Sequence, residues 1–515
     1  MSSVIKNPIL KGFYPDPSIC VVEDDFYLVN STFAYFPGVP IFHSRDLINW
    51  KQIGNILDRN TQINLTGIKH SEGIYAPTIR YNNGEYYLIS TNIPHGGNFI
   101  VKSKSPSGPW SDPYIIEGAE GIDPSLFFDD DGKVYYIGTR PNRSGTKYNG
   151  DWYIWIQEID LVNMKLIGES YDIWNGAMRN VIWPEGPHLY KKDGYYYLMI
   201  AEGGTGEDHC ITISRSKSIY GNYENNPKNP IITHRHLGKE YLIKNVGHGD
   251  LVKTKNDEWY IVMLATRQCN GYSNIGRETF LAKVDWEDGW PIVNKGYGIL
   301  KTDQEIDIKP YKKEYKEKCY HFYSEKLDYR FLFLRNPSDN LYSLKARKGA
   351  LRIYLKENTI NDLANPAYIG VRQEEYKFLV STMMEFNPIN SNESAGLAII
   401  QNNMYNIRYE YSIENSKKVL RIIENKNGNE NEVIKKYIDN ERMFLKIISI
   451  NQNFDFYYSV DGVKYYLLKE NLDCKYLSTE IAGGFVGCTM GMFASSNGKK
   501  SKNYADFLWF EYNNI

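Results

Sequence analysis

The chain has 515 residues, with 60 Lys and Arg against 62 Asp and Glu, so its formal net charge is −2. This balance argues against nucleic acids and membranes as partners, because both need a basic field. The length exceeds the roughly 250–300 residues at which a single core stops growing, so we expect at least two domains. The 43 Tyr, 21 Phe and 10 Trp residues favour β-strands and, more weakly, carbohydrate binding.

The N-terminal residues 1–10 contain no apolar run long enough for a signal sequence, and no stretch of the chain approaches the roughly 18 apolar residues of a membrane span. The six cysteines lie far apart and form no CxxC pair. These features predict a cytoplasmic protein with reduced thiols.

A short phrase recurs five times in the first 300 residues. The copies read Asp16-Pro17-Ser18-Ile19, Ala76-Pro77-Thr78-Ile79, Asp123-Pro124-Ser125-Leu126, Gly186-Pro187-His188-Leu189 and, most degenerate, His248-Gly249-Asp250-Leu251. Each copy precedes a polar turn and then an aromatic strand. Those strands are Phe26-Tyr27-Leu28, Tyr86-Tyr87-Leu88, Tyr135-Tyr136-Ile137, Tyr196-Tyr197-Leu198 and Trp259-Tyr260-Ile261.

The spacing within the copies is nearly constant, because 10, 10, 12, 10 and 11 residues separate each phrase from its aromatic strand. Successive copies advance by 60, 47, 63 and 62 residues, which leaves room for loops beyond a minimal propeller blade of roughly 40–50 residues. Five units of antiparallel strands predict a five-bladed β-propeller. An all-β sandwich with coincidental Tyr-Tyr pairs is the alternative, and five near-equal gaps argue against it.

The segment 300–318 is rich in charged residues and reads as a surface linker. Strand-like runs then resume without the phrase. They include Phe378-Leu379-Val380, residues 396–400, 443–448 and 454–458, and the final Phe507-Leu508-Trp509-Phe510. This pattern predicts a second β domain, most simply a β-sandwich, so we divide the chain at residues 1–305 and 306–515.

Three copies of the phrase carry an acid where the innermost strand of a blade begins: Asp16, Asp123 and Glu185. The other two copies have Ala76 and His248 there. A single Asp-Pro is best explained as a turn, but three acids at one end of one channel raise one another's pKa and are costly unless used. An acid and a base across a cleft is what glycoside hydrolysis requires.

These residues resemble glycoside hydrolase family 43. The resemblance rests on Tyr14-Pro15-Asp16-Pro17-Ser18, Gly121-Ile122-Asp123-Pro124-Ser125-Leu126, Pro184-Glu185-Gly186-Pro187-His188 and Gly276-Arg277-Glu278-Thr279. It is closest to the two-domain β-xylosidases and α-L-arabinofuranosidases. It implies an all-β chain of inverting mechanism, in which a five-bladed propeller is followed by a C-terminal concanavalin-like β-sandwich.

The resemblance also implies roles for individual residues. Asp16 would be the general base, Glu185 the general acid, and Asp123 would orient Glu185 and modulate its pKa. The implied sugar-binding residues are Phe33, Tyr75, Arg277, His248 and Phe485, the last from a loop of the second domain. No cofactor is required, although a calcium ion beside His248 in the channel is possible.

Each of these roles has a structural alternative. Arg277 could instead pair with Glu278 or another acid, and Phe33 and Phe485 could be ordinary core residues. His248 could be a hydrogen-bonded core histidine. The run Gly203-Gly204-Thr205-Gly206 lacks the Lys of a phosphate loop and reads as a turn lining the cleft.

We therefore expect an exo-acting β-1,4-xylosidase that cleaves xylo-oligosaccharides. An α-L-arabinofuranosidase or dual enzyme is the first alternative, because Tyr75 replaces the Trp and Pro184 the Thr of many close members. A non-catalytic sugar-binding propeller is the second. Association into a homo-oligomer through the sandwich domains is possible.

Overall fold

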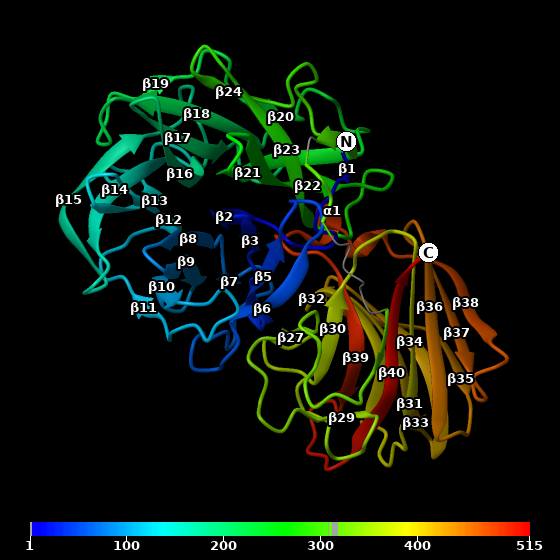
Figure 1. Cartoon of the computed structure of the whole chain (residues 1–515). Helices are drawn as coiled ribbons and strands as arrows, with labels where there is room; N and C mark the ends of the chain where they lie inside the picture. Colours follow the sequence, from blue (N-terminus) through cyan, green and yellow to red (C-terminus); the bar gives the residue numbers. More distant parts are fainter. Residues whose placement is uncertain (1–2, 307, 312–317) are drawn as a thin grey trace.

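The computed structural model describes residues 3–306, 308–311 and 318–515, so residues 307 and 312–317 of the predicted linker lie outside it. The regular secondary structure of the described residues is almost entirely strand, with one short α-helix, α1 (Thr479–Ala482), and one 3₁₀ turn, η1 (Lys475–Leu477). Figure 1 shows a ring of short sheets, coloured blue to green, beside a pair of long sheets coloured yellow to red. No helix of the described ranges is long and apolar enough to cross a membrane.

The described N-terminal part contains five antiparallel sheets of four or five strands, each built from strands that lie close together in sequence. The first consists of β2 (Ser18–Val22), β3 (Asp25–Val29), β5 (Gly38–Ser44) and β6 (Lys51–Leu57). The second consists of β7 (Gly73–Ile74), β8 (Thr78–Asn82), β9 (Glu85–Ile93), β10 (Gly97–Ser103) and β11 (Tyr114–Ile115). The third consists of β12 (Ile122–Phe128), β13 (Val134–Pro141), β14 (Trp152–Asp160) and β15 (Lys165–Trp174).

The fourth sheet consists of β16 (Glu185–Lys192), β17 (Tyr195–Glu202), β18 (Cys210–Ser216), β19 (Glu224–Asn225) and β20 (Ile232–Thr233). The fifth consists of β21 (Ile243–Lys253), β22 (Trp259–Arg267), β23 (Arg277–Glu287) and β24 (Trp290–Val293). The inner strands contact one another in the order β2, β8, β12, β16, β21 and back to β2, which closes a ring. The predicted propeller is thereby confirmed. The N-terminal β1 (Ser3–Lys6) pairs with β25 (Asp303–Ile306).

The recurring phrase explains how the blades are joined. Its third position is always a hydroxyl residue, His or Asp, and each of these side chains contacts another blade. Thr78 and Ser125 donate from their hydroxyls to backbone carbonyls of the next blade, at 2.9 and 2.6 Å. Ser18 donates to the carboxylate of Asp250 at 2.7 Å. The phrase thus places one polar link per blade around the inner ring, where each buried polar group needs a partner.

The C-terminal part is a sandwich of two antiparallel sheets. One contains β26 (Cys319–His321), β28 (Tyr342–Ser343), β29 (Leu351–Tyr354), β31 (Phe378–Glu385), β36 (Arg442–Ile450), β37 (Asn453–Ser459), β38 (Tyr466–Asp473) and β40 (Tyr504–Asn514). The other contains β30 (Tyr368–Arg372), β32 (Ser394–Asn402), β33 (Tyr405–Glu414), β34 (Lys417–Lys426), β35 (Asn429–Tyr437) and β39 (Thr489–Ser495). The predicted final strand is central, because β40 lies between β29 and β31.

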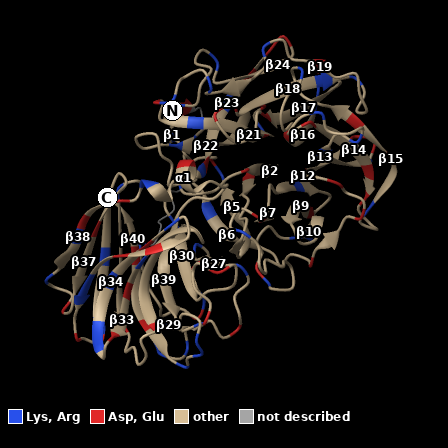
Figure 2. Ribbon diagram, turned by 180° about the vertical axis from the view of Figure 1, so that it is seen from behind, with Lys and Arg blue, Asp and Glu red and all other residues tan. Residues whose placement is uncertain are grey.

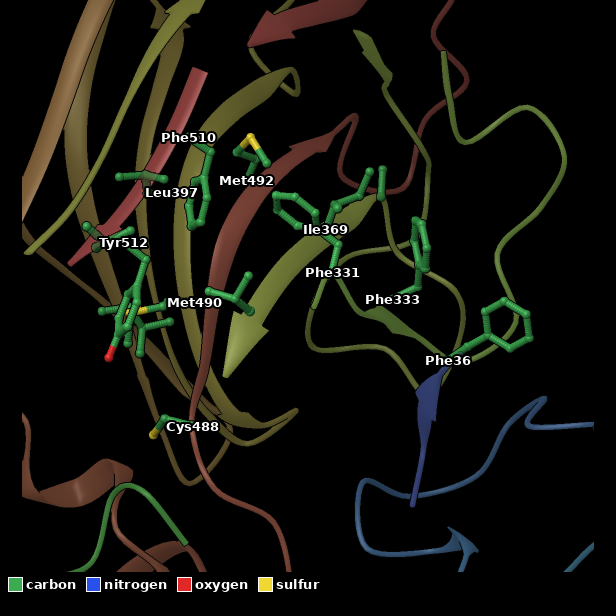
Figure 3. Packing of buried hydrophobic residues seen from close by; sticks show 14 of the residues in the cluster. Phe36, Phe331, Phe333, Ile369, Leu397, Cys488, Met490, Met492, Phe510 and Tyr512 are labelled. Atoms are coloured by element: carbon green, nitrogen blue, oxygen red, sulfur yellow. The ribbon is translucent and has the colours of Figure 1, made fainter. Parts of the chain in front are cut away.

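The sandwich core follows from alternation along its strands. In β36 the side chains of Met443, Leu445 and Ile447 are buried, and their neighbours point outward, as period-two patterning requires. Figure 3 shows Leu397 and Met492 of one sheet and Phe510 of the other in the same cluster of buried side chains. Acidic and basic residues are interspersed along the strands of both domains in Figure 2, in keeping with the small net charge.

A strand pair joins the two domains. The propeller strand β4 (Tyr35–Phe36) pairs antiparallel with β27 (Phe333–Leu334), and Figure 3 shows Phe36 close to this end of the sandwich. The next residue, Arg335, is buried, and it donates from Nε to the carbonyl of Ile68 at 2.7 Å. One hydrophobic cluster also contains residues from both domains. The sandwich is therefore seated firmly enough to contribute to a site on the propeller.

Candidate active site

The three predicted carboxylates line one cavity, together with Arg277 and His248. Asp16 lies two residues before β2, Asp123 is the second residue of β12, and Glu185 is the first residue of β16. The repeat therefore brings together three acids that are 107 and 62 residues apart in sequence.

The backbone at these positions is irregular. Asp16, Asp123 and His248 have φ values of 50°, 53° and 41°, in the left-handed region that such residues seldom adopt. The strand pairing skips residues in β12 and in β16, as in a β-bulge. A bulge re-aims a side chain, and strain of this kind is concentrated at functional sites.

Asp16 is held as a carboxylate. Arg277 donates from Nη1 to its Oδ1 at 2.9 Å, and the hydroxyl of Ser31 donates to its Oδ2. Burial by itself would raise the pKa of Asp16, but Arg277, His248 and the Ser31 hydrogen bond outweigh burial and lower it. Asp16 is therefore ionised at neutral pH and is able to accept a proton.

Asp123 and Glu185 have the opposite tendency. Burial raises the pKa of Asp123 to about 6, and the negative charge of Asp16 adds to the effect. Burial, followed by the charges of Asp123 and Asp16, raises the pKa of Glu185 well above its ordinary value. Asp123 also accepts the backbone N–H of Gly186 at 3.2 Å, beside Glu185. The cavity thus pairs an ionised base with a protonated acid.

Three aromatic rings form one wall of the cavity. The centroids of Phe33 and Tyr75 are 5.6 Å apart, those of Phe33 and Phe485 are 6.0 Å apart, and those of Tyr75 and Phe485 are 6.4 Å apart. Burial raises the pKa of Tyr75 to about 12, so it remains a neutral phenol. The guanidinium of Arg277 lies 5.6 Å from the Phe33 ring and 5.5 Å from the Phe485 ring.

Phe485 reaches the cavity from the second domain. Its backbone N–H donates to the Ser71 hydroxyl at 2.8 Å, and its carbonyl accepts from Arg277 at 3.3 Å. A Cβ on nearby Gly487 would lie 1.8 Å from the carbonyl oxygen of Ile275, so only glycine permits this approach. The Phe485 side chain is 38% exposed, so the alternative of ordinary core packing is wrong for this residue, whereas Phe33 is both buried and cavity-lining.

The alternative that Arg277 pairs with an acid is wrong for Glu278 but confirmed for another acid, Asp16. Glu278 binds Arg267 instead, through two hydrogen bonds of 2.6 and 2.9 Å. Arg277 bonds Asp16 and, through Nη1, the hydroxyl of Thr205 at 3.1 Å. The Arg277 guanidinium therefore lines the cavity and takes no part in the ion pair between Arg267 and Glu278.

Two polar lining residues were not predicted individually. Thr205 and His209 both come from the β17–β18 hairpin, and the run 203–206 was expected only to form a turn lining the cleft. The turn does line it, through Thr205. Nothing in the sequence marks His209, because the hairpin has no counterpart of the recurring phrase.

The channel residues do not fit a directly coordinated calcium ion. His248 lines the cavity, but no group of three or more His, Cys, Asp or Glu side chains within the described ranges could hold a metal. The nearby carboxylate of Asp250 already accepts from Ser18, Tyr190 and Arg80, at 2.7, 2.7 and 2.8 Å. The guanidinium of Arg80 supplies the positive charge there.

Comparisons with known sequences identify the family of each domain. The family model of Glycosyl hydrolases family 43 matches residues 5–291. The model of the Beta xylosidase C-terminal Concanavalin A-like domain matches residues 319–513, which confirms the type of the second domain.

Several relatives match along nearly their whole length. A xylosidase/arabinosidase of Butyrivibrio fibrisolvens is 50% identical over 512 residues, which cover 98% of this chain and 99% of that protein. A non-reducing end alpha-L-arabinofuranosidase of Bacteroides ovatus is 37% identical over 98% of this chain and 94% of its own. The crystal structure of a xylan beta-1,4-xylosidase from Bacillus halodurans has a TM-score of 0.93 at 35% identity and covers 99% of this chain and 100% of that one.

Proposed function

Because this chain belongs to glycosyl hydrolase family 43 and is a glycoside hydrolase, we propose that it is an inverting, exo-acting β-1,4-xylosidase of xylo-oligosaccharides. The observation that carries the proposal is the pairing of Asp16, with a lowered pKa, and Glu185, with a raised one, in a single cavity. Two carboxyl groups in opposite protonation states are what hydrolysis with inversion needs.

In the proposed mechanism Asp16 removes a proton from a water molecule, which attacks the anomeric carbon. Glu185 donates its proton to the departing glycosidic oxygen, so that the leaving group departs as a neutral alcohol. The charge of Asp123 keeps the pKa of Glu185 high, and its bond to the N–H of Gly186 supports the position of the acid. Arg277 keeps Asp16 ionised.

Exo cleavage is supported by the way in which the cavity is closed. Phe485 and the loop around it cover one side, and Phe33 and Tyr75 form a continuous apolar wall with it. Such a pocket accepts the end of a chain, and sugar C–H faces pack well on aromatic rings. We therefore assign the non-reducing terminal sugar to this cavity.

Cleavage of α-L-arabinofuranosides is the second candidate activity. It is favoured by the relative at 50% identity, which is named a xylosidase/arabinosidase, and by the Bacteroides ovatus protein, named an arabinofuranosidase. Tyr75, which differs from the Trp of many family members, lies in the wall that would contact the sugar. A single pocket could accept both sugars if their hydroxyl groups take similar positions.

The deciding experiment compares initial rates on 4-nitrophenyl β-D-xylopyranoside and α-L-arabinofuranoside, with Asp16→Asn as a control. Preference for the xyloside, lost in the variant, supports the first proposal. Preference for the arabinoside transfers the activity to the second, and no turnover of either sugar contradicts both. The anomeric configuration of the first product, observed by proton NMR before mutarotation, tests inversion.

We further propose that the reaction needs no added metal ion, because Arg80 already neutralises Asp250 in the channel. Activity measured after exhaustive chelation should stay within about twofold of its starting value. A large loss that calcium restores would contradict this proposal.

A further inference from the structure

His209 is a buried residue of the cavity that has no part in the mechanism above. Its side chain is only 3% exposed, yet it lines the cavity together with Asp16, Arg277 and His248. Its loop also carries Thr205, whose hydroxyl accepts from Nη1 of Arg277, the same nitrogen that donates to Asp16. The residue therefore lies at the end of the cavity where the base is.

The backbone of β21 holds the His209 ring in place. Nδ1 lies 3.0 Å from the carbonyl oxygen of Asn245, and because a carbonyl can only accept, Nδ1 must carry the hydrogen. A Cβ on Gly247 would lie 2.2 Å from the ring, so this position must be glycine. Both contacts come from an irregular part of β21, where the pairing with β22 shifts twice.

The other ring nitrogen is left as an acceptor. Burial lowers the pKa of His209 to about 3, so the ring is neutral at working pH. With the hydrogen fixed on Nδ1, Nε2 carries a lone pair. Among the residues that the structure describes, no donor reaches Nε2, although the ring lines the cavity.

We propose that Nε2 of His209 accepts a hydrogen bond from a hydroxyl group of the sugar bound beside Asp16. His209 is then a substrate-binding residue that selects for a hydroxyl at one ring position, an inference that rests on the proposed glycosidase function. Arg277 can only donate, so the same end of the cavity offers a sugar hydroxyl both kinds of partner. A site that accepts a hydroxyl discriminates strongly against a sugar that lacks it.

A second histidine that bonds a carbonyl of the same strand, β21, shows the structural counterpart. Nδ1 of His234 lies 2.7 Å from the carbonyl of Ile243, two residues before Asn245, and its Nε2 accepts the N–H of Leu300 at 2.9 Å. Both nitrogens of His234 are thus used within the protein, and the residue is absent from the cavity lining. It is a matched control for His209.

The test uses His209→Asn, His209→Gln and His234→Asn. The Asn amide can replace the Nδ1 donor but not the Nε2 acceptor, whereas the longer Gln can place an oxygen near the position of Nε2. On the glycoside that the wild type prefers, we expect kcat/KM of His209→Asn to fall about 10- to 100-fold, with partial recovery in His209→Gln. His234→Asn should change thermal stability and leave kcat/KM within about twofold.

Monodeoxy versions of the same 4-nitrophenyl glycoside then identify the hydroxyl. For one analogue, wild type and His209→Asn should have the same kcat/KM, because the partner of Nε2 is already missing, while the other analogues keep the full difference. The pH limits of activity should not move, since His209 stays neutral.

Three outcomes would overturn the inference. These are unchanged kinetics of His209→Asn on the parent glycoside, an equal loss in His234→Asn, or a full loss on every deoxy analogue. If His209→Asn does not fold, as judged by circular dichroism and thermal melting, His209→Gln with the deoxy series decides alone. Inactivity of the wild type on both parent glycosides would instead refute the proposed function.

Discussion

The cavity and the channel next to it both contain buried charged residues on the inner strands of the propeller. The pKa of Asp250 is lowered in the channel, whereas the pKa of Glu185 is raised in the cavity. Asp250, in the channel, accepts hydrogen bonds from Ser18, Arg80 and Tyr190, and its pKa is strongly lowered despite complete burial. For Glu185, in the cavity, only the charge of Arg277 opposes burial, and its pKa is raised.

The two sets of residues are separated by only two or three positions along the strands. Asp16 and Ser18 belong to one copy of the recurring phrase, and His248 and Asp250 belong to another. A carboxylate whose oxygens all accept hydrogen bonds stays ionised, and those hydrogen bonds join the blades. A carboxyl group that has few hydrogen-bond donors around it can take up and release a proton, as catalysis requires.

The largest effect on activity should come from replacing the proposed general acid, Glu185. Glu185→Gln should lower kcat on xylobiose by about 10²- to 10⁴-fold, because the sugar leaving group needs protonation. The loss on the 4-nitrophenyl glycoside should be much smaller, because nitrophenolate leaves without a proton. Equal losses on the two substrates would show that Glu185 is not the general acid.

Removing the cation of the channel should mainly affect stability. Arg80→Met leaves Asp250 buried without its counter-charge and should cost about 3–5 kcal/mol, measured by urea unfolding. Adding Asp250→Asn should restore part of the loss. Lys133→Met, which removes a surface ion pair with Glu158, is the control and should leave the midpoint unchanged. An unaffected midpoint in Arg80→Met would contradict the assignment of this pair as a link between blades.

The third prediction concerns the pH dependence of the acid. In the proposed mechanism activity requires protonated Glu185, so it should fall as pH rises through the pKa of that residue. Asp123→Asn removes a negative charge that raises this pKa, so the alkaline limb of kcat/KM should move to lower pH. Asp131→Asn, an exposed acid of the same blade, should leave the profile in place. An alkaline limb that moves to higher pH in Asp123→Asn would rule out this influence of Asp123 on the pKa of Glu185.

The smallest effect should come from removing the side chain that the second domain contributes to the cavity. Phe485→Ala removes one ring of the cavity wall and should raise KM about 5- to 10-fold with little change in kcat, since ring packing contributes about 0.5–1.5 kcal/mol. Tyr466→Ala, an exposed ring of β38, is the control and should change neither constant. Unchanged KM in Phe485→Ala would mean that the loop does not contact the substrate.

The sequence alone determined the features that depend on local pattern. The five phrases and their aromatic strands located the inner strands, because turn residues and period-two alternation act over a few positions. The same register placed Asp16, Asp123 and Glu185 at equivalent strand ends, so their meeting in one cavity was predictable. The role of Phe485 came only from resemblance, since the two domains share no repeat.

Tertiary structure decided what depends on contacts through space. Thr205 and His209 belong to a hairpin without the phrase, and their place in the cavity follows from how β17 and β18 pack beside β21. Arg80 and Asp250 are 170 residues apart in sequence, yet they form the ion pair of the channel. Protonation states depend on burial and on neighbouring charges, which cannot be read from the sequence pattern. Only the folded structure therefore distinguishes the carboxylate that joins the blades from the carboxyl groups suited to proton transfer.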